Sequence, residues 1–288
     1  MKTIRLGDVR IDRVVEIGRS SFPTTSMLPD ATADGIARHL GWLKPAFWDE
    51  STDDLGSRIQ SYVVRTPEHT VLMDTCVGND KHRDGAPAWH MRTGTFLDDL
   101  AALGVRADDV DYVVCTHLHI DHVGWNTSLV DGRWVPTFPK AEYVFVGEEW
   151  EFWKHESDRG AEKDGCIADS VTPIVEAGRA KLVDTTHAIG RHLRFEPAPG
   201  HTPGHVCVRL TTSEGEAVFS GDLMHRIVQV AEPQWSSRFC YEPRRAAETR
   251  RAFVERHVDT GVLVCAAHFP TPGYIVTEGG GPRFQPGG

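Results

Sequence analysis

Short apolar runs of strand length recur along this chain, and polar turns separate them. Runs of about four to eight residues that are rich in valine, isoleucine and leucine are typical of buried β-strands. The predicted strands are residues 59–64, 70–74, 110–116, 143–146, 206–210, 217–220 and 262–266. The pattern therefore predicts extensive β-sheet.

Helical patterns lie between some of these runs. In one, Thr95 is expected to cap a helix with Asp98 three residues later, and Gly104 is expected to end it. A second pattern starts near Pro243 and runs towards Gly261. Strands mixed with helices in this way predict an α/β fold, with mixed sheets covered by helices.

The segment 22–48 combines three prolines with more large apolar side chains than a linker needs. One interpretation is ordinary packing onto the body of the protein. The alternatives are a lid over a pocket and a contact with a second copy of the chain in a homodimer. In each case residues 1–288 are predicted to form a single domain.

Composition and charge narrow the function classes. The 288 residues are 40% hydrophobic and 25% charged, as expected for a globular protein, and the formal net charge is −10. A polyanion is repelled by such a chain on average, so nucleic acid is not an expected partner and nuclease activity is disfavoured. The expected partner is a small-molecule substrate.

The cysteines and the N-terminal segment indicate the cellular compartment in which the protein is expected. The six cysteines form no CxxC pair, and three lie in apolar runs, which predicts buried free thiols in a reducing compartment. Charged residues interrupt the first fifteen positions, so neither a signal peptide nor a membrane span is expected there. We expect a cytoplasmic protein without a membrane partner.

The strongest chemical signal is an HxHxDH string directly after the apolar run 110–115. It places His117, His119, Asp121 and His122 at a strand end, where side chains can point into a shared crevice. A turn there can direct the first two towards one metal ion and the last two towards another. These ligand types suit zinc, manganese, iron or cobalt. The alternative, an exposed polar turn with three histidines, is disfavoured by the tight spacing.

Three further candidate ligands each end an apolar run or lie in a glycine-rich turn. His201 lies in the GHTPGH sequence, Asp222 follows the run 217–220, and His268 follows the run 262–267. Any one of them could be an ordinary polar strand end. If these strand ends lie close together in the fold, the three residues would instead form one metal site.

In this order, HxHxDH, GHTPGH, SGD and AAH resemble the motifs of the metallo-β-lactamase superfamily, and the resemblance covers about residues 63–274. It implies a four-layer αββα sandwich with two divalent metal ions, zinc first, between the inner ends of two sheets. It also implies that His117, His119 and His201 hold the first metal, that Asp121, His122 and His268 hold the second, and that Asp222 bridges them.

The same resemblance gives supporting roles and narrows the activity. It implies that Asp74 is a structural strand-end residue and that His205 supports its turn. A bridging Asp222 disfavours the penicillin-cleaving members and is shared by glyoxalase II, acyl-homoserine lactonases, methyl parathion hydrolase and tRNA-processing nucleases. The acidic charge counts against the nucleases, and the absence of basic residues in 269–273 counts against glyoxalase II.

The motifs GDxxH at 221–225 and AAH at 266–268 resemble the lactonase and organophosphate-hydrolase branch. His225 stands where small acyl-homoserine lactonases tend to carry tyrosine, which weighs against that substrate but not against lactones in general. The prediction is hydrolysis of a lactone or carboxylic ester, with a phosphotriester as the alternative. Less favoured are a thioester hydrolase, a di-iron oxidoreductase, which would usually carry glutamate at His119, and a non-catalytic scaffold.

Metal-assisted hydrolysis defines the expected catalytic roles. Two metals sharing a water can bring its pKa to about 7 and supply a bridging hydroxide, so no serine or cysteine nucleophile is needed. Asp121, or the groups that contact the bridging hydroxide, is predicted to move a proton to the leaving group. His225 is predicted either to face the substrate or to hydrogen-bond a neighbouring loop. Apolar residues of 22–48 are predicted to form the opposite wall of the pocket.

Overall fold

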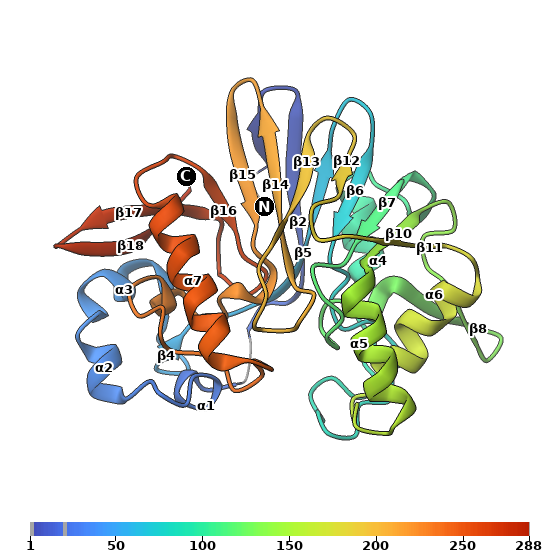
Figure 1. The fold of residues 1–288 in the computed structure, drawn as a ribbon, viewed down its shortest axis with the longest axis horizontal. Coiled ribbons are helices and arrows are strands. Elements are labelled where there is room, and N and C mark those ends of the chain that lie inside the picture. Colours follow the sequence, from blue (N-terminus) through green and yellow to red (C-terminus); the bar gives the residue numbers. More distant parts are fainter. Residues whose placement is uncertain (1–2, 20–21, 288) are drawn as a thin grey trace.

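Two seven-stranded sheets lie against each other in the computed structural model, which describes residues 3–19 and 22–287 (Figure 1). The strands of the first sheet, in spatial order, are β1 (Ile4–Leu6), β2 (Val9–Ile17), β5 (Ile59–Arg65), β6 (Thr70–Met73), β7 (Tyr112–Val114), β10 (Glu142–Val146) and β11 (Ala180–Val183). Those of the second are β12 (Ala188–Ile189), β13 (Leu193–Pro197), β14 (Val206–Thr212), β15 (Gly215–Phe219), β16 (Leu263–Cys265), β17 (Gly273–Glu278) and β18 (Gly281–Pro286). The sheets form the two inner layers.

Parallel pairing brings the chemically interesting strand ends together. In the first sheet β6 pairs with β7 in parallel, with Met73 opposite Val114. In the second, β15 pairs with β16 in parallel, with Phe219 opposite Cys265. Because the carboxyl ends of parallel strands meet at one edge, the segments that follow these four strands emerge at shared edges of the two sheets.

Helices cover the outer faces of both sheets. On the first sheet lie α4 (Phe96–Ala102), α5 (Gly147–Asp158) and α6 (Thr172–Glu176), and on the second lies α7 (Pro243–His257), on opposite sides of Figure 1. The helices bury Phe96 and Trp150 on one side and Phe253 on the other, whereas a third apolar cluster fills the space between the sheets. These layers confirm the αββα sandwich.

The segment 22–48 packs on the same outer face as α7. It forms α1 (Thr24–Met27), α2 (Ala33–Ala37) and α3 (Leu40–Phe47), and it buries Leu28, Leu43 and Phe47 in the cluster that contains Trp235 and Phe253. Ordinary packing is therefore what the structure shows. The lid and the homodimer contact stay predictions.

Short elements complete the fold. They are the hairpins β3 (Trp48–Asp49) with β4 (Asp54–Leu55) and β8 (Thr127–Val130) with β9 (Arg133–Pro136), and the single turns η1 (Ala107–Asp109), η2 (Gly124–Asn126), η3 (Ile167–Val171), η4 (Gly221–Leu223) and η5 (Ile227–Val230). Within residues 3–19 and 22–287, no helix has the length and apolar character that a membrane crossing requires.

The predicted strands and helices are observed, with one local correction. Helix α4 starts beside Thr95 and is followed by Gly104 at φ 77°, as expected. The Thr95 side chain makes no cap, because its hydroxyl donates a hydrogen bond to Oδ2 of Asp99 at 2.8 Å instead. The domain prediction for 1–288 includes residues 1–2, 20–21 and 288, which lie outside the described residues.

Candidate metal centre

The HxHxDH string forms a turn after β7 that is fixed by Asp74 at the end of β6. Asp74 has a positive φ of 57°, and its Oδ1 accepts a hydrogen bond from the Thr116 backbone N–H at 2.8 Å. Its Oδ2 lies 3.0 Å from Nδ1 of His122. The Thr116 hydroxyl lies 3.2 Å from Nδ1 of His117. With Nδ1 facing these oxygens, both rings present Nε2 to the site, which is how supporting groups orient metal-binding histidines.

Asp222 is positioned by a turn that His205 supports. The His205 Nδ1 donates to the carbonyl of Ala198 at 3.0 Å, and its Nε2 accepts the backbone N–H of Asp222 at 3.0 Å. The preceding Gly221 has φ 49°, and a Cβ on it would lie 2.6 Å from that same Nε2. Glycine is thus required there, and His205 is occupied in holding the turn.

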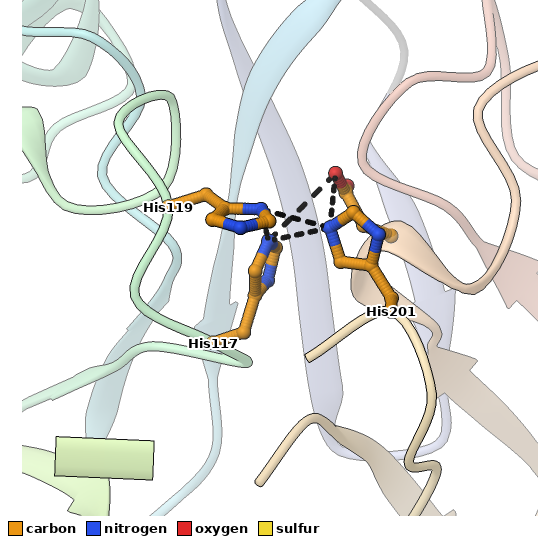
Figure 2. Close-up of side chains that lie close together, drawn as sticks. His117, His119 and His201 are labelled. Carbon is orange, nitrogen blue, oxygen red and sulfur yellow. Dashed lines mark hydrogen bonds and ion pairs between the residues drawn. The ribbon is translucent and has the colours of Figure 1, made fainter. Parts of the chain in front are cut away.

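The first group of candidate ligands consists of His117, His119 and His201. Figure 2 shows the three rings converging from two loops, with dashed lines meeting between them. The ring nitrogens Nε2 of His117, Nδ1 of His119 and Nε2 of His201 lie 2.9–3.2 Å from one another. Burial lowers the pKa of all three, to about 3 for His119, so the lone pairs stay free for a metal ion.

The second group consists of Asp121, His122 and His268. The Nε2 atoms of His122 and His268 lie 3.7 and 3.6 Å from the carboxylate oxygens of Asp121. His268 is oriented by its Nδ1, which donates to the carbonyl of Arg58 at 2.8 Å. Asp121 is the partly exposed member, with 12% of its side chain accessible. The group offers two nitrogens and a carboxylate, a donor set that suits zinc.

Asp222 lies between the two groups. Its Oδ1 is 3.0 Å from Nε2 of both His122 and His268, and its Oδ2 is 3.4 Å from Nε2 of His201 and 3.7 Å from that of His117. Burial alone would raise the pKa of Asp222, but the nearby histidines outweigh it and hold the pKa well below its usual range. One carboxylate oxygen therefore faces each group.

The donors fit a pair of divalent cations. The buried Oδ1 of Asp222 and Nε2 of His122 lack a well-oriented hydrogen-bond partner among the described residues. Three mutually adjacent imidazole nitrogens cannot all be satisfied by one another, because each hydrogen bond needs one donor and one acceptor. A cation in each group would satisfy these atoms. The structure thus brings all seven predicted ligands together.

His225 lies against the ligands. Its side chain is buried, its Nε2 is 3.0 Å from Oδ2 of Asp222, and its ring stacks on that of His268 with a centroid distance of 5.3 Å. Its Nδ1 has no hydrogen-bond partner among the described residues. The ring therefore faces the ligand cluster, and its catalytic role stays a prediction.

Glu149 on α5 is a buried carboxylate that sequence reasoning missed. Its Oε1 accepts the Leu118 backbone N–H at 3.1 Å and the Trp153 indole N–H at 2.8 Å, and its Oε2 accepts the Gly204 backbone N–H at 2.9 Å. Burial raises its pKa, and these hydrogen bonds oppose the rise. Glu149 thereby joins the HxHxDH turn to the GHTPGH turn. Nothing in the sequence distinguishes it from neighbouring acidic residues.

Cys240 is a second residue that the sequence did not indicate. Its Sγ lies 3.7 Å from Nδ1 of His201, the ring atom that points away from the first group. Five of the six free cysteines are buried, as predicted, and Cys240 is half-buried. Cys240 lies against Nδ1 of His201, just as Asp74 lies against Nδ1 of His122.

The profile of the metallo-beta-lactamase superfamily matches residues 56–268. The chain belongs to this superfamily. An N-acyl homoserine lactonase from Bacillus sp is 22% identical over 172 residues, which are 54% of this chain and 60% of that protein. Metallo-hydrolase mfmC from Annulohypoxylon moriforme is 31% identical over 135 residues, 43% of this chain and 33% of that protein. The chain thus spans about three-fifths of the lactonase and a third of mfmC.

Solved structures share the fold along the whole chain. The hydrolase AbOPH of the beta lactamase superfamily superposes with a TM-score of 0.81 at 24% identity, covering 99% of this chain and 97% of that one. AidC, a dizinc quorum-quenching lactonase, superposes with a TM-score of 0.76 at 21% identity, covering 100% and 97%. At these identities the similarity shows the fold.

Proposed function

We propose that this chain hydrolyses a lactone or carboxylic ester at a dinuclear metal centre, with zinc as the metal. The observation that carries the proposal is Asp222, whose two carboxylate oxygens face two separate ligand groups. Membership of the superfamily supports it, as does the similarity to a Bacillus lactonase and to the dizinc lactonase AidC.

The two ligand groups and Asp121 have different proposed roles in the reaction. Two divalent ions held here would bring the pKa of a shared water to about 7 and polarise the substrate carbonyl. Asp121 is the one partly exposed carboxylate of the two groups, so it can accept the proton of the attacking water and then pass it to the departing alkoxide. The histidines of the first group stay neutral, so their ring nitrogens would hold one of these ions.

Aromatic side chains favour a substrate with an apolar acyl or aryl part. The Trp153 ring contacts that of His119 at 5.1 Å, Phe152 contacts Trp153 at 5.0 Å, and Tyr241 contacts Phe152 at 4.8 Å. Tyr241 is 60% exposed, so this row of aromatic side chains leads from a ligand to the surface. Residues 22–48 bury Leu28, Leu43 and Phe47 in the core, and the apolar wall expected from this segment stays a prediction.

Metal analysis and a substrate screen test the proposal. Protein loaded with zinc and dialysed should hold about two ions per chain, and it should hydrolyse lactones or aryl esters faster than thioesters or phosphotriesters. Chelation should abolish turnover, and zinc should restore it. A ratio of one ion that added metal does not change would contradict the dinuclear centre. Preferential phosphotriester cleavage would favour the alternative activity, and no turnover would favour a scaffold.

His225 gives a sharper test of the site. The Nδ1 of its buried ring has no hydrogen-bond partner among the described residues, and we propose a carbonyl oxygen of the substrate as that partner. We expect His225→Ala to lower kcat/KM by roughly 100-fold with metal content and melting temperature unchanged. A loss of activity explained entirely by unfolding or metal depletion would leave His225 with a structural role.

The proposed partner is a small molecule, with neither nucleic acid nor a membrane involved. Gel filtration of the metal-loaded chain would test the homodimer that remains an alternative role for 22–48.

A further inference from the structure

A cavity of about 320 Å³ lies beside the loop that carries His268, and none of the seven candidate ligands lines it. Its walls are residues 18–19, 46–50, 56–58 and 270. We call it the Arg58 cavity. None of its lining residues belongs to the proposed hydrolytic site, so binding of a ligand there can be measured without measuring turnover.

Arg58 brings an uncompensated positive charge to this cavity. Its side chain is half-buried and makes no hydrogen bond or ion pair with any other described residue. Arg58 directly precedes β5, and two residues further on the Gln60 amide donates to the carbonyl of Phe269 at 2.8 Å. Arg58 and Pro270 both line the cavity, so this wall includes the start of the loop that follows His268.

A second guanidinium strengthens the positive field. Burial lowers the pKa of Arg58 and the charge of Arg13 lowers it further, against a smaller opposing effect of the Tyr62 phenol, and none of these groups is a carboxylate. Arg13 is itself held by the carbonyl of Pro270 at 2.9 Å. Of the two acidic residues in the wall, Asp49 is paired with Arg19 at 2.6 Å and Glu50 is exposed. Neither neutralises Arg58.

Ser57 adds a buried hydroxyl in need of a partner. Its side chain is 4% exposed, and its Oγ forms no hydrogen bond with the described residues. Buried hydroxyls in folded proteins nearly always have a partner, so an isolated one in a cavity wall indicates a position for a ligand atom. Ser57 and Arg58 are neighbours in the sequence and both line the cavity, and a hydroxyl together with an unpaired guanidinium suits an oxyanion.

We propose that the Arg58 cavity is a binding site for a small oxyanion, a carboxylate or a phosphate group, held by the Arg58 guanidinium and the Ser57 hydroxyl. Phe47 and Trp48 in the wall would contact an apolar part of the same ligand. The main chain of Arg58 is bonded to His268 twice, through its N–H to the His268 carbonyl at 3.1 Å and through its carbonyl to Nδ1 at 2.8 Å. Binding of an anion in the Arg58 cavity would therefore affect His268, a candidate ligand of the second group.

Calorimetric titration of acetate and of inorganic phosphate into the metal-loaded chain, at constant ionic strength set by chloride, tests the site. We expect one saturable site, weakened at least tenfold in Arg58→Met and several-fold in Ser57→Ala. Arg194→Met is the matched control, because Arg194 is an exposed arginine of β13, and it should bind as the parent does. Tighter binding of acetate identifies a carboxylate ligand, and tighter binding of phosphate identifies a phosphate.

Equal affinity in the parent and a folded Arg58→Met variant would overturn the proposal, since the anion would then bind elsewhere, for example at the metals. Absence of saturable binding by either anion would overturn it as well. If circular dichroism shows that Arg58→Met is unfolded, Ser57→Ala decides: weakened binding supports the site, and parental affinity overturns it.

Discussion

The two halves of the chain contribute their candidate ligands to the candidate metal centre in different ways. The first half supplies four of them from one turn, which begins beside Asp74. The second half supplies His201, Asp222 and His268 from three separate loops. Each of these has its own support, namely Cys240, His205 and the carbonyl of Arg58.

This difference indicates how many candidate ligands a substitution in each half should disturb. In the first half a single turn carries all four candidate ligands, and Asp74 supports that turn as a whole. In the second half each ligand depends on a contact with a residue distant in sequence. Changes there should therefore affect one ligand at a time, except at Asp222 and Glu149, which touch both halves.

The largest effect is expected from Asp222→Asn. Asparagine has one carboxamide oxygen, and its amide nitrogen does not bind cations, so only one of the two groups would keep its fourth ligand. Metal content should fall from about two ions per chain to one or fewer, and activity should fall at least about 100-fold. Elemental analysis after dialysis measures the metal content. The exposed Asp108 gives a matched control in Asp108→Asn. Retention of both ions would refute the bridge.

Glu149→Ala tests the connection between the halves. It leaves the backbone N–H groups of Leu118 and Gly204 and the indole of Trp153 without acceptors, which should lower the free energy of unfolding by about 3 kcal/mol or more. Urea denaturation measures this change. Glu148→Ala, at an exposed position of the same helix, should stay within about 0.5 kcal/mol of the parent. Similar losses in both variants would contradict a specific role for Glu149.

His205→Ala separates support from ligation in the second half. Losing the acceptor for the Asp222 backbone N–H should lower the free energy of unfolding by about 2 kcal/mol, with roughly two metal ions retained. Thermal unfolding and elemental analysis on the same preparation measure both. The assignment would be wrong if the variant kept its stability and lost metal.

Cys240→Ala should have the smallest effect. A thiol at 3.7 Å is a weak support for His201, so we expect about a tenfold loss of affinity for one of the two ions. Competition with a chromophoric chelator measures it. Cys240→Ser keeps a polar atom behind the ring and should recover part of the loss. Parental affinity in Cys240→Ala would show that His201 needs no such support.

The fold was predictable where strands are buried on both faces. Parallel strands such as β7 and β16 read as continuous apolar runs, because helices cover one side and the other sheet covers the second. Strand β2 was not predicted because charged residues interrupt its apolar ones, and β17 was not predicted because its apolar run is only three residues long. Their place in the sheets is decided by pairing with distant strands.

The candidate ligands were predictable because histidine and aspartate at strand ends are scarce and conspicuous. The residues that position these ligands could not be predicted from the sequence. Arg58 acts on His268 through a main-chain carbonyl, which any residue would provide. Glu149 is one of several acidic residues on α5, and only the tertiary structure shows that it alone is buried between two turns. Supports of this kind are set by packing rather than by residue type.

Glu149 also determines how the protein should open. Helix α5 belongs to an outer layer, yet its carboxylate holds the amides of Leu118 and Gly204 beside the metal ligands. Those two amides cannot exchange with solvent while the helix is docked. They should therefore exchange in step with the amides of α5, as one cooperative unit, and metal release should require the same opening.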